Sequence, residues 1–471
     1  MKRRLRVYKK TVSIVNETAT GMYESLVGDK KGFLLESYDK NYDRYTFFGK
    51  EPEEIISSRG NALVITKNDG TQEVRNGNPL ERLKEYYSEF DIVKDNEELS
   101  FSGGLVGNLG YDFVRYAEVL PDNNPDEIGI ETVQMMLMTK FIMVDHVAET
   151  LTGIILGEDT PEGKEKSLEE AEELIRQALA NKGRAPEKNF THDGVIVNQS
   201  DSLEQYSQKV EKIKEYIREG HIFQTVLSQR WTIETKQSGF ELYKELRELN
   251  PSPYLYYFNY GDFEVIGSSP EMIVKQQGNR VYTCPIAGTR KRGADAEEDA
   301  LLRDELLQDE KERAEHVMLV DLARNDMGRI SEFGTVKVTQ FMEVQNYSHV
   351  MHIVSMVEGR KKGEFHPLDL VSSFLPAGTL SGAPKIRAME IIDELESVRR
   401  GLYGGATGYI DFSGDMDFCI TIRTMIKKEN RVYLQAGAGI VADSVPENEY
   451  QECCNKVMAL AKTLVNVSST L

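Results

Sequence analysis

The chain has 471 residues, of which 40% are hydrophobic and 28% charged, as is usual for a soluble globular protein that can bury a large core. Its formal net charge of −20 disfavours nucleic acid and anionic membrane surfaces as partners, and no apolar run approaches the length of a membrane span. The basic start MKRRLRVYKK lacks the apolar segment of a signal peptide, and the four cysteines show no metal-ligand spacing. We therefore expect a cytoplasmic protein, because few cysteines in a long chain are typical of a reducing compartment.

The first part of the chain, over 11–150, has mostly the pattern of β structure. Short apolar runs at 32–37 and 44–49 predict strands, and 135–145 predicts one long buried strand. The segment 103–112, GGLVGNLGYD, contains too much glycine for a helix interior and indicates close backbone packing or bends.

A domain boundary is predicted near residue 190. A charged amphipathic helix over 161–181 is followed by 182–200, which has the composition of a linker. We therefore predict an N-terminal domain over 1–190 and a second domain over 200–468.

The second part begins with a capping box, in which Ser202 is followed three residues later by Gln205, and its helix precedes a strand at 222–231 that contains Gln224. Further strands and helices follow in hairpin-like succession, with a helical pattern at 297–325 and a predicted strand at 416–425. Strands in such succession indicate an α+β fold with large antiparallel β-sheets.

Near the C-terminus, a short strand is predicted at 432–435, with Gly437 and Gly439 opening its end. Ser444 stands three residues before Glu447, which predicts a second capping box at the start of the last helix. The glycines imitate a dinucleotide-binding fingerprint, but a helix should then begin at the glycines within a βαβ unit, so we reject nucleotide binding.

The last helix should carry Glu449, Glu452 and Lys456 on one face, since these positions are neighbours on a 3.6-residue period. One interpretation is a solvated helix face with an ordinary ion pair. The other is a ligand site, because the glycine-opened strand end lets a small molecule approach the backbone.

Glu315 continues the apolar stripe of its predicted helix, where a carboxylate would be buried beside Met318 and Leu322. Such burial requires a partner for the charge. A buried arginine is one candidate, and a metal ion held together with Glu449 and Glu452 is the other.

Two further residues have two interpretations each. Glu271, in the loop GSSPE between two predicted strands, is either a surface turn acid or a general acid. His352, in the strand HVMHIVSM, is either a core histidine or a residue of the site.

The motifs of the whole chain, taken together, resemble the chorismate-utilising enzymes, and within them the large subunits of anthranilate synthase. The matching segments are LLES (34–37), GGLVGNLGYD (103–112), FQTVLSQR (223–230), NPSPYLYYF (250–258), SSPEM (268–272), PIAGTRKRG (285–293), ERAEHVMLVDLARND (312–326), YSHVMHIVS (347–355), PAGTLSGAPKIRAMEII (376–392), LYGGATGYI (402–410), FCITIRTM (418–425) and GAGIVADSVPENEYQE (437–452). The resemblance covers nearly the whole chain and implies a sandwich of large antiparallel sheets flanked by helices.

The resemblance also implies a role for each residue of the site. It implies that Glu315, Glu449 and Glu452 surround a Mg²⁺ ion bridged to a carboxylate of chorismate, and that Glu271 protonates the departing C4 hydroxyl. The substrate's carboxylates and ring would be held by Arg423, Lys456, Tyr403, the backbone at Gly437 and Gly439, and by Gly288, Thr289 and His352. One divalent cation and two basic side chains would offset the local negative charge for a dianionic substrate.

Two positions distinguish the activities within this family. Relatives that activate water have a lysine where this chain has Gln224, and a glutamine orients ammonia but does not act as a base. Aminodeoxychorismate synthases have a nucleophilic lysine where this chain has Ala287. Both differences favour direct attack of ammonia at C2 and loss of pyruvate, which yields anthranilate. Aminodeoxychorismate synthase and a catalytically silent tryptophan-binding regulator are the alternatives.

The resemblance further implies feedback inhibition by tryptophan in the N-terminal domain. The residues that match this regulatory site are Glu36, Ser37, Pro253, Tyr254 and Leu255. The chain shows no glutaminase-like cysteine motif, so a separate glutamine amidotransferase subunit is expected to supply the ammonia.

Overall fold

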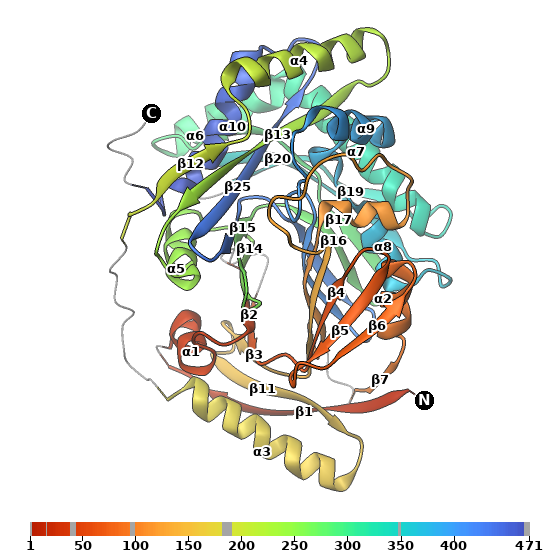
Figure 1. The fold of residues 1–471 in the computed structure, drawn as a ribbon, viewed down its shortest axis with the longest axis vertical. Helices are drawn as coiled ribbons and strands as arrows, with labels where there is room; N and C mark the ends of the chain where they lie inside the picture. The colour runs from red at the N-terminus through yellow and green to blue at the C-terminus, as the bar shows by residue number, and fades with distance from the viewer. Residues whose placement is uncertain are drawn as a thin grey trace.

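A computed structural model of the chain describes residues 2–15, 17–37, 44–94, 99–180, 191–346 and 350–465 (Figure 1). Two large β-sheets pack face to face, and helices cover their outer faces. The predicted α+β class with large antiparallel sheets in a sandwich flanked by helices is confirmed. No helix among the described residues is both long and apolar enough to cross a membrane.

The first sheet, sheet A, has thirteen strands in the described residues. In spatial order they are β12 (Val195–Gln199), β13 (Gln224–Glu234), β25 (Arg431–Ile440), β24 (Thr424–Lys428), β15 (Glu264–Ser269), β14 (Tyr254–Asn259), β2 (Gly32–Glu36), β3 (Tyr45–Lys50), β10 (Lys140–Asp145), β11 (Thr150–Glu158), β1 (Arg3–Ser13) and β7 (Phe90–Val93), with β21 (Gly382–Ala383) beside β13. The β1–β7 pair is parallel, whereas the other pairs of named strands in this sheet are antiparallel.

The second sheet, sheet B, has twelve strands in the described residues. In spatial order they are β18 (Ile286–Lys291), β20 (Val350–Arg360), β17 (Arg280–Thr283), β16 (Met272–Gln277), β23 (Met416–Ile420), β22 (Ala406–Asp411), β8 (Gly104–Leu109), β9 (Val133–Met138), β4 (Glu54–Ser58), β5 (Ala62–Lys67) and β6 (Gln72–Asn76), with β19 (Lys337–Asn346) beside β20.

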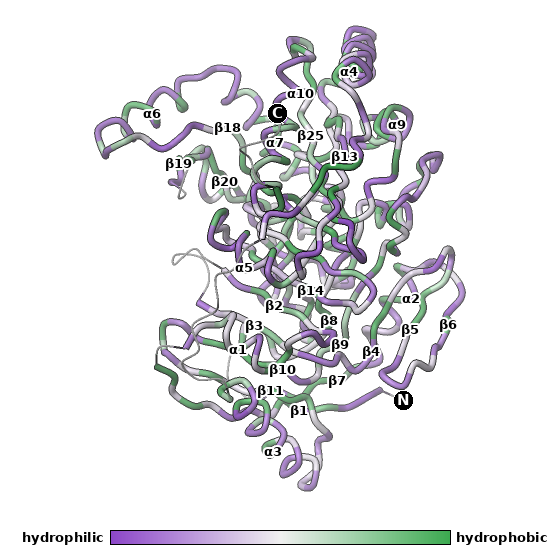
Figure 2. Tube along the Cα trace, turned by 60° about the vertical axis from the view of Figure 1, so that its left-hand side comes forward, coloured by the Kyte–Doolittle hydropathy of each residue, from purple (hydrophilic) through white to green (hydrophobic). Residues whose placement is uncertain are grey.

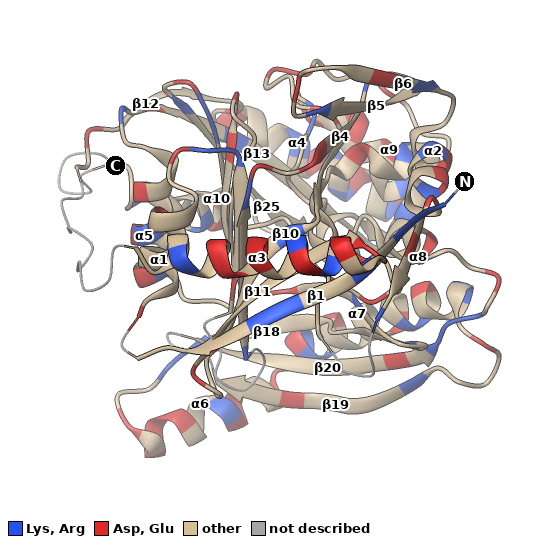
Figure 3. Ribbon diagram, turned by 90° about the horizontal axis from the view of Figure 1, so that it is seen from below, with Lys and Arg blue, Asp and Glu red and all other residues tan. Residues whose placement is uncertain are grey.

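The helices form the outer layers of the sandwich. They are α1 (Ala19–Leu26), α2 (Pro79–Tyr87), α3 (Pro161–Ala178), α4 (Leu203–Arg218), α5 (Gly239–Leu249), α6 (Ala296–Gln308), α7 (Glu310–Ile330), α8 (Pro367–Phe374), α9 (Lys385–Leu395) and α10 (Pro446–Ala461), with short 3₁₀ turns η1 (Tyr111–Tyr116) and η2 (Gly378–Leu380). Figure 3 shows α3 crossing β1 and β11, with acidic and basic residues interspersed along the helix. Figure 2 shows α6 and the nearby ends of β18, β19 and β20 projecting from the body.

Three apolar clusters make up most of the core. One lies between the two sheets, a second between sheet A and its helices, and a third between sheet B and its helices. The strand β9 shows the arrangement, because Met136 and Met138 face sheet A whereas Met135 and Leu137 face the helices. Successive side chains of a strand point to opposite faces, and here both faces are buried.

Two segments that the sequence predicts as single strands are each two strands in different sheets. The predicted strand 135–145 consists of the end of β9 in sheet B and β10 in sheet A, which are separated only at Thr139. The predicted strand 416–425 likewise contains β23 of sheet B and the start of β24 of sheet A. A continuous apolar run carries no turn signal at such a crossing, because the change of sheet is determined by distant pairing partners.

Both sheets combine strands from the two halves of the chain. The strand β2 lies between β3 and the later β14, and β8 lies between β9 and the later β22. Part of the predicted linker 182–200 forms the edge strand β12, and residues 181–190 lie outside the described residues. The division into domains over 1–190 and 200–468 stays a prediction.

The capping box predicted at Ser202 is confirmed, since Ser202 and Gln205 each bond the other's backbone N–H at the start of α4. Tyr206, Val210 and Ile213 form its buried stripe.

Candidate active site

Two of the predicted residues lie where the chain crosses from one sheet to the other. Glu271 lies between β15 of sheet A and β16 of sheet B, and Arg423 lies between β23 of sheet B and β24 of sheet A. The two connections are hydrogen-bonded to each other. The Ile420 N–H donates to the Glu271 carbonyl oxygen at 2.9 Å, and the Ser268 N–H donates to the Arg423 carbonyl oxygen at 3.0 Å. The backbone thereby holds an acidic and a basic side chain near each other.

Glu271 is a buried acid rather than a surface turn residue. Its Oε1 accepts a hydrogen bond of 3.0 Å from the Thr379 hydroxyl. Burial raises the pKa of Glu271 to about 7, against the lowering effects of the Thr379 hydrogen bond and the charges of Arg423 and Lys456. A carboxyl group with this pKa carries its proton at neutral pH about half of the time, which suits a general acid.

Arg423 combines a half-buried charge with an unusual backbone conformation. Its φ of +51° lies in the left-handed region, which is uncommon for a residue with a Cβ and is concentrated at functional sites. Burial lowers the pKa of its guanidinium, and the charges of Glu271 and Glu452 act in the opposite direction. Within the described residues Arg423 forms no ion pair. A half-buried guanidinium without an ion-pair partner favours an anionic ligand.

The glycines of the C-terminal motif lie inside a strand, which corrects the prediction that they open its end. Gly437 pairs with Ser228 and Gly439 with Val226, so that β25 continues along β13 to Ile440. A side chain at Gly439 would lie 2.6 Å from the Gln224 amide nitrogen. The buried amide of Gln224 therefore lies directly over the strand at this point.

Lys456 attaches α10 to this strand. Its ammonium donates to the Gly437 carbonyl oxygen at 2.8 Å and pairs with Glu452 at 2.5 Å. The predicted i, i+4 ion pair of Glu452 and Lys456 is present. Because Lys456 also bonds β25, the pair lies at the candidate site and not only on a solvated helix face.

The capping box predicted from Ser444 and Glu447 is wrong. The residue before the helix is Val445, whose side chain cannot cap, and the Ser444 hydroxyl instead accepts from the Val441 N–H at 3.0 Å. A hydrogen bond with Ser444 also lowers the pKa of Glu449, although burial and the charge of Glu452 give a net rise. Ser444 thus forms hydrogen bonds with its own loop and with Glu449 and does not cap the helix.

Glu315 points from α7 toward the same group of charges. Burial raises the pKa of its carboxyl, and the charges of Glu312 and Glu452 add to the rise while Lys311 and Lys456 oppose it. Within the described residues Glu315 has no arginine partner, so the interpretation as a buried Glu–Arg pair is not supported.

Glu315, Glu449 and Glu452 fit a divalent cation by their chemistry. Carboxylate oxygens are the ligands that Mg²⁺ prefers, and the charge of Glu452 raises the pKa of both other carboxyls, a repulsion that a cation would relieve. Among the described residues, however, no three acidic, histidine or cysteine side chains lie close enough together to surround one ion.

His352 pairs with Thr289 across β20 and β18, next to a bulge at Gly288, whose φ is +65°. The His352 Nδ1–H donates to the Gly288 carbonyl oxygen at 2.9 Å, and the Thr289 hydroxyl lies 3.0 Å from the same nitrogen. Because Nδ1 carries the proton, Nε2 is the basic nitrogen. Burial and the charge of Arg423 lower the pKa of His352 despite its bond to Gly288. The imidazole is therefore neutral at pH 7.

Tyr403 completes the group. It is buried, and its hydroxyl would lie 3.1 Å from a Cβ placed at Gly437. Burial raises the pKa of its phenol, so the group is a neutral hydrogen-bond donor beside β25.

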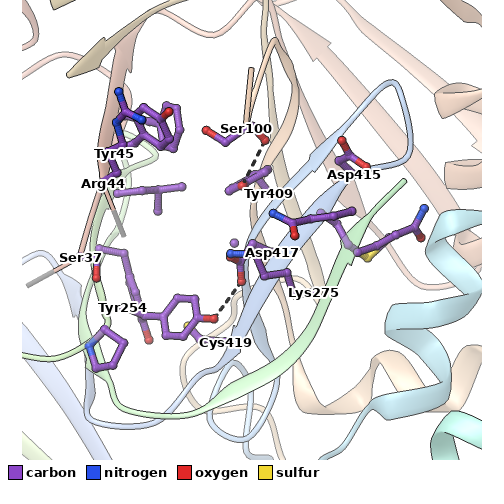
Figure 4. A pocket seen from close by; sticks show the side chains of 18 of the residues that line it. Ser37, Arg44, Tyr45, Ser100, Tyr254, Lys275, Tyr409, Asp415, Asp417 and Cys419 are labelled. Carbon is purple, nitrogen blue, oxygen red and sulfur yellow. Dashed lines mark hydrogen bonds and ion pairs between the residues drawn. The ribbon is translucent and has the colours of Figure 1, made fainter. Parts of the chain in front are cut away.

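The five residues predicted to bind tryptophan line one cavity of about 860 Å³ (Figure 4). They are Glu36, Ser37, Pro253, Tyr254 and Leu255. The opposite wall includes Tyr409, Asp417 and Cys419, so strands of both sheets line the cavity. The Tyr254 hydroxyl donates to Asp417 at 2.9 Å across it, and the Tyr409 hydroxyl donates to the Ser100 carbonyl oxygen at 3.3 Å.

Most charged side chains of this cavity have partners. Arg247 bonds the buried Glu36 at 2.9 Å, and Lys275 pairs with Asp417 at 2.8 Å. The Ser37 hydroxyl, in contrast, is buried and has no hydrogen-bond partner within the described residues. It is a group that a ligand could satisfy.

Comparison with known proteins shows to which family the chain belongs. Residues 33–462 match the family of chorismate binding enzymes. The chain belongs to this family. The anthranilate synthase component 1 of Acetivibrio thermocellus is 45% identical over 458 residues, which cover 95% of this chain and 93% of the relative. That of Bacillus subtilis is 42% identical over 448 residues, which cover 92% and 87% of the two chains.

Two solved structures share the fold of this chain. The crystal structure of anthranilate synthase component I from Streptococcus pneumoniae TIGR4 has a TM-score of 0.78 at 39% identity, covering 89% of this chain and 92% of that one. The menaquinone-specific isochorismate synthase of Escherichia coli has a TM-score of 0.73 at 18% identity, covering 98% and 95% of the two chains. The second likeness concerns the fold alone.

The sequence interpretation assigned no role to Thr379 or Lys311. Thr379 lies in the motif PAGTLSG, and its hydroxyl contacts the general-acid candidate. Lys311 lies one turn before Glu315 and lowers the pKa of both Glu315 and Glu449. The i, i+4 spacing of Lys311 and Glu315 was visible in the sequence and could have suggested that their charges interact.

Proposed function

We propose that this chain is the chorismate-converting large subunit of an anthranilate synthase, which adds ammonia to C2 of chorismate and eliminates pyruvate to release anthranilate. The observation that carries the proposal is the buried Glu271 beside Arg423, with Gln224 and Ala287 at the two positions that distinguish the family's activities. Relatives at 41–45% identity bear this name, which supports the proposal.

The proposed reaction begins with binding of the dianion. Arg423 and Lys456 attract the carboxylates, and Tyr403 with the backbone of β25 orients them. Ammonia attacks C2 while Glu271 gives its proton to the C4 hydroxyl, which leaves as water. The added nitrogen then loses one proton. Loss of the C2 proton expels the enolpyruvyl group, which takes up a proton to become pyruvate, and the ring becomes aromatic.

Gln224 acts on the nucleophile in this proposal. Its amide lies over Gly439, at the floor of the site, and its carbonyl oxygen accepts a hydrogen bond from ammonia without removing a proton. Ala287 lies on β18 two residues before Thr289, where a methyl group forms no covalent adduct.

Mg²⁺ is the proposed cofactor, with Glu315, Glu449 and Glu452 as the residues that would hold it. The ion would supply positive charge to a substrate carboxylate. The support is the donor chemistry and the mutual repulsion of these carboxylates.

The need for ammonia leads to the proposed partner protein. A glutamine amidotransferase subunit, component 2 of the synthase, would release ammonia from glutamine, because little free NH₃ exists at neutral pH. Tryptophan is the proposed inhibitor, bound in the cavity that holds Glu36, Ser37 and Tyr254.

One assay tests the proposal against its alternatives. The purified chain is incubated with chorismate, Mg²⁺ and ammonium at raised pH, and anthranilate fluorescence is followed. We expect anthranilate with ammonium and none with glutamine until the amidotransferase is added. Accumulation of aminodeoxychorismate would favour the alternative synthase, and tryptophan binding without turnover would favour the silent regulator.

A further inference from the structure

A buried ion pair lies behind the substrate site and takes no part in the proposed chemistry. Glu396 follows the end of α9, and Arg400 lies four residues later; the side chains are 3% and 2% exposed, so neither is in contact with bulk water. The Arg400 Nε donates to Glu396 Oε2 at 2.9 Å, and Nη2 donates to Oε1 at 2.6 Å. The pair is bidentate, which fixes the orientation of both groups.

The remaining hydrogen bonds of the pair all reach the elements next to the site. Arg400 donates to the Val226 carbonyl oxygen of β13 at 2.8 Å and to the Leu380 carbonyl oxygen of η2 at 2.5 Å. Glu396 accepts from both the N–H and the hydroxyl of Ser228, at 2.8 and 2.7 Å. The pair therefore holds β13 at two points, Val226 and Ser228.

The guanidinium also packs against two aromatic rings. Its carbon lies 4.6 Å from the ring centre of Tyr111 and 5.7 Å from that of Tyr403. Both distances are within the range of a cation–π interaction. Tyr111 comes from η1, so that the N-terminal part of the chain contributes one of the two rings.

The two groups positioned by Arg400 meet at Gly437. A Cβ at Gly437 would lie 2.9 Å from Val226 Cγ1 and 3.1 Å from the Tyr403 hydroxyl. The carbonyl oxygen of Gly437 is the acceptor for Lys456. A small shift of Val226 or Tyr403 would thus change the shape of the surface that receives the substrate.

The Glu396–Arg400 pair contributes hydrogen bonds of fixed direction. A buried ion pair often adds little net stability over apolar residues of similar size, whereas its bonds specify geometry. We propose that Glu396 and Arg400 are positioning residues that hold Val226 and Tyr403 around Gly437 and so set the affinity for chorismate. This inference rests on the proposed function.

The test is Arg400→Lys in the full-length chain. A lysine keeps the charge and can still pair with Glu396, but one ammonium does not bond the Val226 and Leu380 carbonyl oxygens and cover two rings at once. We expect KM for chorismate to rise about tenfold with kcat within about twofold, because binding of substrate and transition state is weakened equally. Ser228→Ala, a smaller change that removes one donor to Glu396, should raise KM about threefold.

Arg115→Lys is the matched control. Arg115 bonds Asp112 at 2.7 Å and Asp393 of α9 at 3.0 Å, so it anchors the same helix away from the site. We expect this variant to lower the melting temperature but to keep the wild-type KM. An unchanged KM in both Arg400→Lys and Ser228→Ala, or an equal rise in Arg115→Lys, would overturn the inference. Failure of the wild-type chain to form anthranilate would instead reject the proposed function.

Discussion

The candidate active site and the cavity at Glu36 differ in how their charges are paired. In the cavity, Glu36 is bonded by Arg247 and Asp417 is bonded by Lys275. At the candidate active site, Arg423 and Glu315 form no ion pair within the described residues, and burial shifts the pKa of each toward its neutral form.

This difference indicates what each region can bind. Partly buried charges without partners raise the free energy of the protein, and a ligand that carries the opposite charges offsets this cost. The candidate active site therefore favours a highly charged ligand, such as the dianion and metal ion proposed above. In the cavity a ligand must share partners with existing ion pairs, so its affinity depends on shape and on neutral groups such as the Ser37 hydroxyl.

The largest expected effect comes from removing the acid. Glu271→Gln should keep the Thr379 hydrogen bond and the fold but lower kcat about 10³-fold, because the leaving hydroxyl loses its proton donor. The measurement is steady-state anthranilate formation with the concentration of free NH₃ held constant. For the wild type, kcat/KM should decrease as pH rises through about 7, where Glu271 loses its proton. Wild-type turnover in Glu271→Gln would assign the acid to another group.

The same carboxyl should affect stability. Its pKa of about 7 in the folded chain lies above its ordinary value of 4.5, so the folded state binds the proton more tightly. The resulting stabilisation is complete below pH 4.5 and is lost as pH rises through 7, a difference of about 3 kcal/mol. Urea unfolding of the wild type and Glu271→Gln at several pH values measures it. If the two proteins show parallel pH dependence, the carboxyl is ionised without a penalty.

Glu315→Gln tests whether the carboxylates of Glu315, Glu449 and Glu452 bind a metal. The substitution is nearly isosteric but removes one anionic ligand, so activity at limiting Mg²⁺ should decrease about 10²-fold and Mg²⁺ titrations should show weaker binding. Calorimetry with Mg²⁺ alone provides a readout that does not depend on turnover. Full activity of the variant in the presence of excess chelator would reject the assignment.

The smallest effect on turnover is expected in the cavity. Ser37→Arg places a long side chain in the space beside Tyr254 and should remove inhibition by tryptophan while anthranilate formation continues. Linkage requires that chorismate weaken tryptophan binding by the same factor by which tryptophan weakens chorismate binding. Equilibrium binding of each ligand at several concentrations of the other checks this equality. Unchanged inhibition in an active Ser37→Arg protein would locate the regulatory site elsewhere.

Local signals predicted part of the secondary structure, and the family motifs supplied the candidate residues of the site. The capping box at Ser202 and the helical stripe of α4 follow from short-range rules, and the structure contains both. The capping box at Ser444 fails although it has the same spacing, because the Ser444 hydroxyl bonds the Val441 N–H of its own loop. Spacing alone does not reveal which of several nearby donors a hydroxyl will bond.

The sequence pattern did not predict which distant segments lie next to each other. Arg423 was predicted within a strand, whereas it occupies a crossing between sheets with a φ of +51°. The ion pair of Glu396 and Arg400 was also missed, since its meaning depends on contacts with Val226 and Ser228, which are distant in the chain. Such contacts become visible only when strands from different parts of the sequence lie together.

The mixed composition of the two sheets has a consequence for biosynthesis. During translation, β2 and β8 are synthesised long before their neighbours β14 and β22. The nascent chain therefore contains two strands that each lack a hydrogen-bonding partner until the later strands are made. The unpaired edges of such strands can form hydrogen bonds with other chains, and pairing between distant segments is slow. Cells that make this protein in quantity should therefore depend on chaperones that shield the growing N-terminal half until the last strands are synthesised.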